Sequence, residues 1–456
     1  MPAEPTDRQA EIVATEEGVL KWACTGIEGQ LNFEDIVCAV PNPERRPGCR
    51  VLFLDKNGGT GEDSSIRLAT INIPSIPVAL TSFLAEIPIH LRCGEPVQVV
   101  ISTRSGTGTA RAVFQDLLRP FLRNLSVDYR VYETQSAQSI LELSQSLFLS
   151  RASTGVPQTI ILLSGDGGLI DILDVFSKSK DAIRAAPTLA LIPCGTGNAM
   201  ASSMGLRSGP ASGLAPLLRG QPIPLPTFTV KLSPGSQMVT DEGKGRVSIE
   251  PGAESDTATH HTMYGAVVAS WGLHAALVAD SDTTDYRRFG SERFKMAAKE
   301  LLYPSDGSES HRFRGQITMT TTASDDDADL DLRSETVAEN EHMYVLATLV
   351  PRLEKDFLIS PDSVPLSGKI RFLRFGPQSP EEAMRLMTLA YQGGQHVREE
   401  SVTYREVESL RIDFQEELER WRRVCIDGKI VVVEKGGWIV LSKEPRQLLC
   451  VLQSGP

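Results

Sequence analysis

The sequence lacks long apolar runs and paired cysteine motifs. No apolar stretch reaches eighteen residues, so no transmembrane helix is predicted. The seven cysteines form no CxxC pair and no zinc-like spacing, and their odd number favours reduced thiols over a disulfide framework. The seven histidines are dispersed apart from His260 and His261. We therefore expect neither a transition-metal site nor a disulfide-stabilised fold.

The sequence also lacks an excess of positive charge. Its 58 aspartates and glutamates outnumber its 46 lysines and arginines, which gives a net charge of -12. A polyphosphate backbone would repel such a chain, so nucleic acid is not an expected partner. A membrane surface stays open as a partner, since local arginines or exposed apolar side chains can dock an acidic protein. Residues 1–18 are polar and acidic without a signal-peptide core, which predicts a disordered tail and a cytoplasmic location.

Three segments of different patterning follow the tail. Short strand-like runs over 19–95 end in a stretch of helical spacing, which suggests a small β-rich module, either pleckstrin-homology-like or an extra layer on the main fold. Strands and helices alternate over 96–220, and apolar runs such as TIILL are typical of a mostly parallel sheet. Residues 221–456 predict an antiparallel β-rich, sandwich-like domain with polar loops at 233–262 and 324–341. The predicted fold class is an α/β nucleotide-binding domain followed by this β-rich domain.

Three strands of the α/β segment each run into a glycine-bearing loop. The loops are VVISTRSGTGTA at 99–110, ILLSGDGGL at 161–169 and LALIPCGTGNAMA at 189–201. Glycine leaves backbone N–H groups free to face a ligand, and a following helix adds its positive end, so phosphate is the natural ligand. One such loop is often only the tight turn of a strand–helix unit. Three of them at the carboxyl ends of strands in one sheet are expected to converge on one ligand.

Two other nucleotide-binding motifs fit these loops less well. GTGTA at 106–110 is close to a dinucleotide fingerprint, and Glu133 closes a later strand where a ribose-binding acid could stand. Arg111 replaces the third glycine of that fingerprint, however, and a dinucleotide gives no role to SGDGG. The loops also lack the lysine of a Walker A motif, which argues against a P-loop enzyme.

The loops together resemble the diacylglycerol kinase catalytic superfamily. SGDGGLIDIL is similar to its GDG motif, and IPCGTGNAMA to its proline-glycine-threonine/serine-glycine-asparagine motif. The segment VVASWGLHAALVADSDTTDYRRFGSERF at 267–294 is similar to the substrate segment of sphingosine kinases, and the resemblance extends over about 98–442. It implies an ATP-dependent lipid kinase that uses Mg²⁺, phosphorylates a hydroxyl of a sphingoid base or related lipid, and associates transiently with a membrane surface.

The resemblance also implies roles for individual residues. Asp166 is the expected catalytic residue, which orients the substrate hydroxyl or holds Mg²⁺ with Asp171. Either Asp280 or Asp282 would face the lipid head group, depending on how the segment is aligned, and Trp271 belongs to the same lipid-substrate set. The expected nucleotide-binding residues lie in and around the loops and at three basic positions. They are Ser102, Arg104, Ser105, Gly106, Gly108, Thr134, Ser164, Gly165, Gly167, Gly195, Thr196, Gly197, Asn198, Arg287, Arg293 and Lys429.

The sequence departs from the family pattern in each part of the expected site. Ser102 and Thr103 replace asparagine-proline, Gly168 replaces threonine or leucine, and Asp171 stands where a glutamate is common. Lys429 in CIDGK takes the place of the glutamate in the family's aspartate-glycine-glutamate. Two alternatives therefore stay open. One is a catalytically impaired regulatory protein that binds lipid or nucleotide, and the other is a diacylglycerol, ceramide or NAD kinase.

Overall fold

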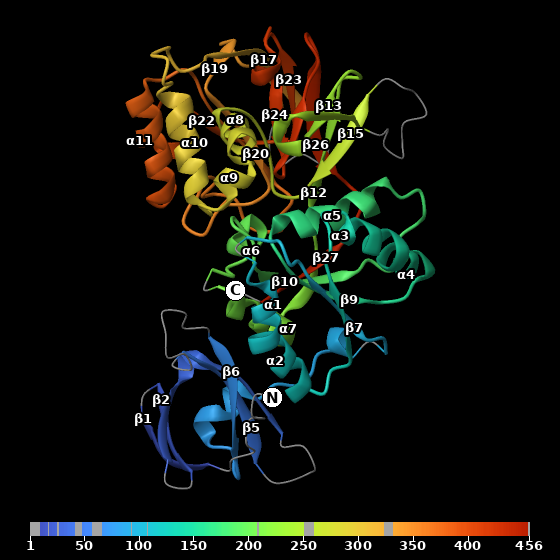
Figure 1. Ribbon diagram of the computed structural model, residues 1–456, viewed down its shortest axis with the longest axis vertical. Coiled ribbons are helices and arrows are strands. Elements are labelled where there is room, and N and C mark those ends of the chain that lie inside the picture. The colour runs from blue at the N-terminus through green and yellow to red at the C-terminus, as the bar shows by residue number, and fades with distance from the viewer. Residues whose placement is uncertain are drawn as a thin grey trace.

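Three parts succeed one another along the longest axis of the protein (Figure 1). The computed structural model describes residues 10–16, 18–24, 27–41, 48–56, 66–92, 94–106, 108–207, 209–249, 260–322 and 332–454. A small β-rich module lies at the bottom of the view, an α/β domain in the middle and a large β-rich domain at the top. This arrangement confirms the predicted fold class. No helix within the described ranges has the length and apolar character needed to cross a membrane.

The N-terminal module consists of two three-stranded antiparallel sheets. The first comprises β1 (Glu11–Glu16), β2 (Val19–Cys24) and β3 (Ile27–Asn32), and the second comprises β4 (Ile36–Pro41), β5 (Cys49–Asp55) and β6 (Arg67–Ile73). Leu20, Val51, Ile73 and Leu80 pack in its core. The predicted disordered tail is wrong over residues 10–16, because β1 pairs with β2 and Ala10 N donates to Asn72 O at 2.8 Å. A pleckstrin-homology-like identity of the module stays a prediction.

The α/β domain is built on a six-stranded, mostly parallel sheet in the order β11-β27-β10-β9-β7-β8. Its parallel core strands are β7 (Val97–Ile101), β8 (Tyr129–Glu133), β9 (Thr159–Ser164) and β10 (Thr188–Pro193). Every residue of β7 and β9 is buried, as expected of strands covered on both faces. The connecting helices are α1 (Ala110–Val113), α2 (Arg119–Asn124), α3 (Ser139–Leu143), α4 (Leu149–Thr154), α5 (Asp166–Lys178), α6 (Ala199–Ser203) and α7 (Leu214–Arg219).

Two strands from beyond the predicted boundary at residue 220 complete this sheet. They are β11 (Gln221–Pro224) and β27 (Cys450–Gln453), and β27 lies between β11 and β10. Thr188 of β10 is the register partner of Cys450 in the parallel pair. The end of the chain therefore returns to the α/β domain. Local sequence patterns identify a strand but not the sheet that it joins, which is why the predicted boundary differs from the structure.

The β-rich domain contains two larger antiparallel sheets that share one hydrophobic core. One sheet holds β12 (Thr227–Leu232), β15 (His261–Gly265), β17 (Phe313–Thr322), β18 (Leu332–Thr336), β19 (Glu341–His342), β23 (Ser409–Phe414) and β26 (Trp438–Glu444). The other holds β13 (Gln237–Thr240), β14 (Gly245–Ser248), β16 (Val268–Gly272), β20 (Tyr344–Thr348), β21 (Ile370–Phe375), β22 (Val402–Val407), β24 (Arg423–Ile426) and β25 (Lys429–Val432). Four helices gather beside β20 and β22 (Figure 1): α8 (Leu273–Ser281), α9 (Thr284–Arg287), α10 (Glu292–Leu302) and α11 (Pro380–Tyr391).

The two predicted polar loops are only partly loops. The hairpin β13–β14 lies within 233–262, and β18 lies within 324–341. All five side chains of β18 are exposed, and so are three of the four in β14. These strands therefore lack the apolar alternation that would have identified them from the sequence. Residues 250–259 and 324–331 lie outside the described part of the chain.

Candidate active site

The three glycine loops meet where β7, β9 and β10 end. Gly165 N donates to Ser105 Oγ at 3.0 Å, and that hydroxyl lies 3.2 Å from Ser164 Oγ. The second and third loops touch backbone to backbone, since a Cβ added to Gly195 would lie 2.3 Å from Gly165 Cα. A Cβ on Gly106, whose φ is +53°, would lie 2.6 Å from the carbonyl oxygen of Cys194. Glycine at these positions is thus required for the three loops to approach one another.

A cavity of about 790 Å³ lies in front of the loops, between the α/β and β-rich domains. Its volume is typical of a pocket for a small organic ligand. Many of the predicted site residues line it, from both domains. They are Arg104, Ser105, Gly106, Gly165, Asp166, Gly167, Gly195, Thr196, Gly197, Asp282, Arg287, Arg293 and Lys429.

Several predicted nucleotide-binding residues shape the loops instead of lining this cavity. Thr134 Oγ1 accepts a hydrogen bond from Thr103 N at 3.0 Å, and Thr134 O accepts one from Thr103 Oγ1 at 2.9 Å, so Thr134 braces the first loop from behind. Asn198 has a left-handed backbone with φ 49°, and its side chain forms hydrogen bonds with both Gly195 N and Gly195 O. The remaining predicted members that do not line this cavity are Ser102, Gly108 and Ser164.

Asp166 is the first residue of α5 and connects the second loop to the third. Its Oδ2 accepts a hydrogen bond from Ala199 N at 2.6 Å, and its Oδ1 accepts one from Met200 N at 3.0 Å. Burial raises the pKa of Asp166, and the two N–H groups oppose that shift by stabilising the carboxylate. The side chain is thereby fixed in position at the cavity wall, where a substrate hydroxyl could reach it.

Asp427 is a second half-buried carboxylate in the cavity wall, and sequence reasoning missed it. Its oxygens accept hydrogen bonds from the backbone N–H groups of Ala266, Val267 and Val268 at 2.6, 3.1 and 2.6 Å. The pKa of Asp427 is raised to about 7. Burial is the main cause and the charge of Asp166 adds to it, whereas the three hydrogen bonds act in the opposite direction. The signal in the sequence was the Asp-Gly pair of CIDGK, which is a typical two-residue turn between hairpin strands.

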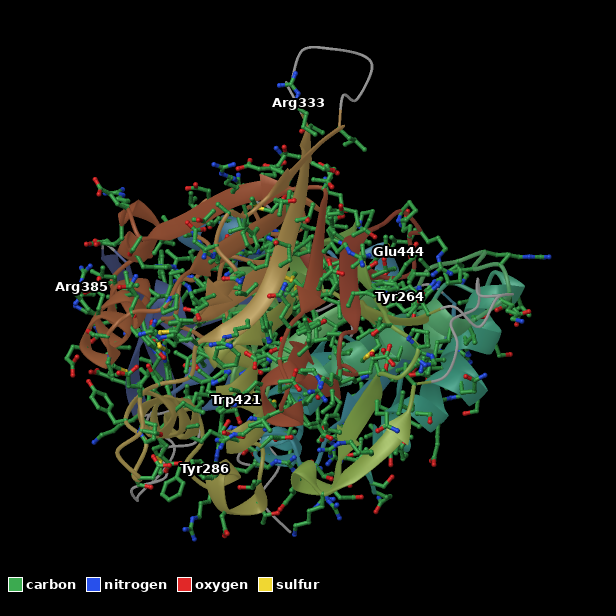
Figure 2. The ribbon with its side chains drawn as sticks, turned by 90° about the horizontal axis from the view of Figure 1, so that it is seen from above. Tyr264, Tyr286, Arg333, Arg385, Trp421 and Glu444 are labelled. Carbon is green, nitrogen blue, oxygen red and sulfur yellow. The ribbon has the colours of Figure 1, made fainter. Side chains whose placement is uncertain are left out.

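Arg287 and Arg293 line the cavity together and share one carboxylate. Arg287 Nε donates to Asp282 Oδ1 at 3.0 Å, and Arg293 Nη1 lies 3.6 Å from the same oxygen. Burial lowers the pKa of Arg293, and Asp282 opposes this shift. Two guanidinium groups at one wall form a suitable site for phosphate oxygens. Tyr286, which precedes Arg287, lies at the periphery of the molecule in the view of Figure 2.

The two candidate aspartates for the lipid head group have different surroundings. Asp282 lines the cavity, whereas Asp280 does not. Asp280 Oδ2 accepts a hydrogen bond from Arg420 at 2.9 Å, and its Oδ1 accepts one from Arg423 at 2.7 Å. Of the two alignments left open by the sequence, the geometry thus favours the one that points to Asp282.

Lys429 lines the cavity but has partners on α5. Its Nζ forms an ion pair with Asp174 and lies 4.0 Å from Asp171 Oδ1. Burial raises the pKa of Asp171 to about 6, Lys429 lowers it, and Asp174 raises it. Asp171 itself does not line the cavity. Within the described ranges, no three or more His, Cys, Asp or Glu residues are grouped to hold a metal ion, and the roles of Asp166 and Asp171 toward Mg²⁺ stay predictions.

Trp271 does not contact the cavity, contrary to the prediction that it serves the lipid substrate. It is fully buried on β16, and its Nε1 donates to the carbonyl oxygen of Trp421 at 2.8 Å. Phe313, His342 and Phe414 surround it edge-on, with centroid distances of 5.9, 5.6 and 5.1 Å. Its strand is covered on both faces, so the residue is a core residue of the β-rich domain. Trp421 is labelled in Figure 2.

The cavity wall formed by the helices of the β-rich domain is largely apolar. The side chains come from α8, α10, α11 and the segment 353–357. They are Leu277, Val278, Phe294, Ala298, Leu353, Phe357, Met384, Met387 and Tyr391. A single cavity therefore combines backbone-lined glycine loops, two arginines and a surface suited to a hydrocarbon chain.

Comparison with known proteins agrees with this geometry. Residues 96–230 match the family model of the diacylglycerol kinase catalytic domain. The predicted resemblance to this superfamily is confirmed. The matched residues contain all three glycine loops and the strands β7 to β11 of the α/β sheet, and they end within β12. Strand β27 of that sheet lies outside the match.

Other relatives align with longer stretches of the chain, at low identity. Sphingosine kinase 1 of Arabidopsis thaliana is 22% identical over 341 residues, which are 69% of this chain and 63% of that protein. Sphingosine kinase 2 of Homo sapiens is 23% identical over 277 residues, which are 59% of this chain and 34% of that protein. The chain thus spans less than two thirds of the length of either relative. A solved structure of a candidate diacylglycerol kinase from Bacillus anthracis superposes on this chain with a TM-score of 0.51 at 14% sequence identity. The match covers 79% of this chain and 96% of that protein's chain, which shows a shared fold.

Proposed function

We propose that the protein is an ATP-dependent lipid kinase that phosphorylates a hydroxyl of a sphingoid base or a related lipid. The observation that carries this proposal is the composition of the cavity. Glycine loops and arginines suited to phosphate share it with an apolar wall suited to a lipid chain. A soluble dinucleotide would make no use of that apolar wall, which disfavours an NAD kinase.

The chain's own residues divide the work of phosphoryl transfer. Backbone N–H groups of the loops and the side chain of Arg104 bind the phosphates, and Arg287 and Arg293 hold them from the opposite domain. Mg²⁺ bound with ATP would neutralise charge on the phosphate oxygens, which is the chemistry that such kinases need from it. No three His, Cys, Asp or Glu side chains in the described part of the chain are grouped to hold a metal ion, which fits an ion held mainly by the nucleotide.

The acceptor lipid would be positioned by the two carboxylates nearest the loops and arginines. Asp166 accepts the proton of the attacking hydroxyl, because its side chain is held at the cavity wall by Ala199 N and Met200 N. Asp282 accepts hydrogen bonds from a hydroxyl or amine of the head group. Since Asp282 also pairs with Arg287, phosphate binding to the arginine would release this carboxylate for the lipid.

A catalytically impaired protein that binds lipid or nucleotide is the second candidate function. The observation in its favour is Lys429, a cation at the cavity wall in place of the family's glutamate. Such a protein would keep the cavity and its ligands but lack turnover.

Incubation with labelled ATP, Mg²⁺ and a lipid panel tests the proposal and separates the two functions. The panel contains a sphingoid base, a ceramide and a diacylglycerol, with NAD as the soluble acceptor. We expect label to appear in a lipid and not in NAD. Retained ATP binding without any labelled product would contradict the kinase and support the impaired protein. Flotation of the purified protein with lipid vesicles checks the transient, peripheral membrane contact that a lipid substrate implies for a cytoplasmic protein.

A further inference from the structure

Tyr344 is a buried tyrosine in the cavity wall whose hydroxyl has no hydrogen-bond partner within the described part of the chain. Its side chain on β20 is 1% exposed. Phe375 stacks on its ring at 5.1 Å between centroids, which holds the ring in one orientation. Buried hydroxyls are nearly always satisfied in folded proteins, because losing water without gaining a partner is unfavourable. An unsatisfied hydroxyl at a ligand cavity therefore indicates a partner that the ligand supplies.

His274 of α8 lines the same cavity beside Tyr344. The two rings meet edge-on at 5.8 Å between centroids. His274 Nδ1 lies 2.7 Å from Ser270 Oγ, which fixes the orientation of the imidazole. Burial lowers the pKa of His274 to about 4 and raises the pKa of Tyr344, so both groups are neutral near pH 7. Together they form a small polar spot in a wall that is otherwise mainly apolar.

The chemistry of this spot restricts what it can bind. Phosphate and ammonium groups need counter-charges, and the neutral phenol and imidazole provide none. Their complement is a neutral oxygen, either a hydroxyl or a carbonyl, that enters together with an apolar chain. The charged end of the cavity, at Asp282, Arg287 and Arg293, is made of different residues, so the polar spot is a separate point of recognition.

We propose that Tyr344 and His274 form a subsite that binds a hydroxyl or carbonyl oxygen on the apolar body of the lipid, distinct from the hydroxyl that is phosphorylated. The inference rests on the proposed function only in taking the ligand to be a lipid. It means that the protein selects among lipids of equal chain length by an oxygen atom outside the reacting head. A hydroxylated long chain and an N-acyl group are the two sources of such an oxygen.

Binding measurements with three lipids of one chain length test this subsite. The lipids are sphinganine, 4-hydroxysphinganine and N-acetylsphinganine, presented in detergent micelles without nucleotide. Wild-type protein is expected to bind one of the two oxygenated lipids about five- to tenfold more tightly than sphinganine, the worth of one neutral hydrogen bond. A preference for 4-hydroxysphinganine identifies the hydroxyl, and one for N-acetylsphinganine identifies the carbonyl.

Tyr344→Phe and His274→Phe should remove this preference while leaving sphinganine binding within about twofold. Tyr404→Phe is the matched control, because its hydroxyl lies 2.8 Å from Ser360 Oγ and the residue does not line the cavity. A preference retained in Tyr344→Phe, or equal binding of all three lipids by the wild type, overturns the subsite. The readout is binding, so a failure of phosphoryl transfer would overturn the kinase and not the subsite.

Discussion

Lys429 of β25 forms an ion pair with Asp174 of α5, and the two residues are 255 positions apart in the sequence. The pair joins the β-rich domain to the α/β domain beside the cavity. Both side chains are largely buried, at 23% and 14% exposed. The cation at the position where the resemblance leads us to expect a glutamate thus has its own counter-charge on a neighbouring helix, and Asp171 lies 4.0 Å from it.

Lys429→Met should destabilise the protein, because it leaves Asp171 and Asp174 close together without a cation. We expect the free energy of unfolding to fall by about 1–3 kcal/mol in urea titrations. Lys435→Met is the matched control, since Lys435 pairs with Glu417 at the surface and both side chains are mostly exposed. That control should change stability by less than about 0.5 kcal/mol. Equal effects of the two substitutions would contradict a structural role of the Lys429 pair.

Asp166→Asn should abolish lipid phosphorylation, because an amide cannot accept the proton of the attacking hydroxyl. Nucleotide affinity should stay within about tenfold, which corresponds to about 1.4 kcal/mol. In the wild type, the two carboxylate oxygens accept hydrogen bonds from Ala199 N and Met200 N. Asparagine replaces one of these oxygens by an NH₂ group, which cannot accept, so the free energy of unfolding should fall by about 1–3 kcal/mol. Turnover and ATP titration are measured on folded protein. Unchanged turnover would remove Asp166 from the catalytic role.

Asp282→Asn and Asp280→Asn are a matched pair two residues apart. Asp282 lines the cavity, so its replacement should lower kcat/KM for the lipid by about tenfold or more, as expected when one charged contact to a head group is lost. Asp280 pairs with Arg420 and Arg423 away from the cavity, so its replacement should leave kcat/KM within about twofold. Steady-state kinetics with lipid varied at saturating ATP measure both. The reverse order of effects would restore the alternative alignment.

Gly195→Ala and Gly167→Ala separate loop packing from ligand contact. A Cβ on Gly195 would lie 2.3 Å from Gly165 Cα, so this change should destabilise the protein by about 1–3 kcal/mol. A Cβ on Gly167 meets no protein atom within 4 Å, and this residue lines the cavity. Gly167→Ala should therefore fold normally but bind ATP more weakly. Normal ATP affinity in Gly167→Ala would show that phosphate does not approach the loop there.

Asp427 should make stability depend on pH near neutrality. Its pKa rises from 3.8 to about 7 on folding, so the folded protein binds this proton more tightly than the unfolded chain. The resulting stabilisation is complete below pH 4 and is lost as the pH rises toward 7. Asp427→Asn cannot titrate, so the stability of the wild type relative to this variant should decline between pH 5 and 7.5.

Urea unfolding of both proteins at several pH values measures this difference. His274, His342 and His396 have pKa values lowered to about 4, so their contribution to the pH dependence of stability has the opposite sign. That contribution is common to both proteins and cancels in the difference between them. A stability difference that stays constant across the range would exclude Asp427 as the titrating group.

Local patterns in the sequence determined the α/β alternation and the glycine loops. Buried strands such as β9 appear as continuous apolar runs, and the loop glycines occur directly after them, so neighbouring residues carry the signal. The family resemblance of the same segments gave the expected function and the loop and arginine residues of the cavity wall, but none of the apolar residues that its helices contribute. The hairpin turn at Asp427 was equally visible in the sequence, but its meaning depended on Ala266, Val267 and Val268 far away in the chain.

Only the tertiary structure decided which side chains face the cavity. Asp280 and Asp282 share one short segment, and what separates them is the position of Arg420 and Arg423 on another part of the chain. Trp271 lies among aromatic residues from distant strands, and β27, which begins at Cys450, joins a sheet whose first strand β7 begins at Val97. The partner of Lys429 is likewise on a helix of the other domain. Such contacts depend on packing between remote segments, which no local pattern of apolar and polar residues encodes.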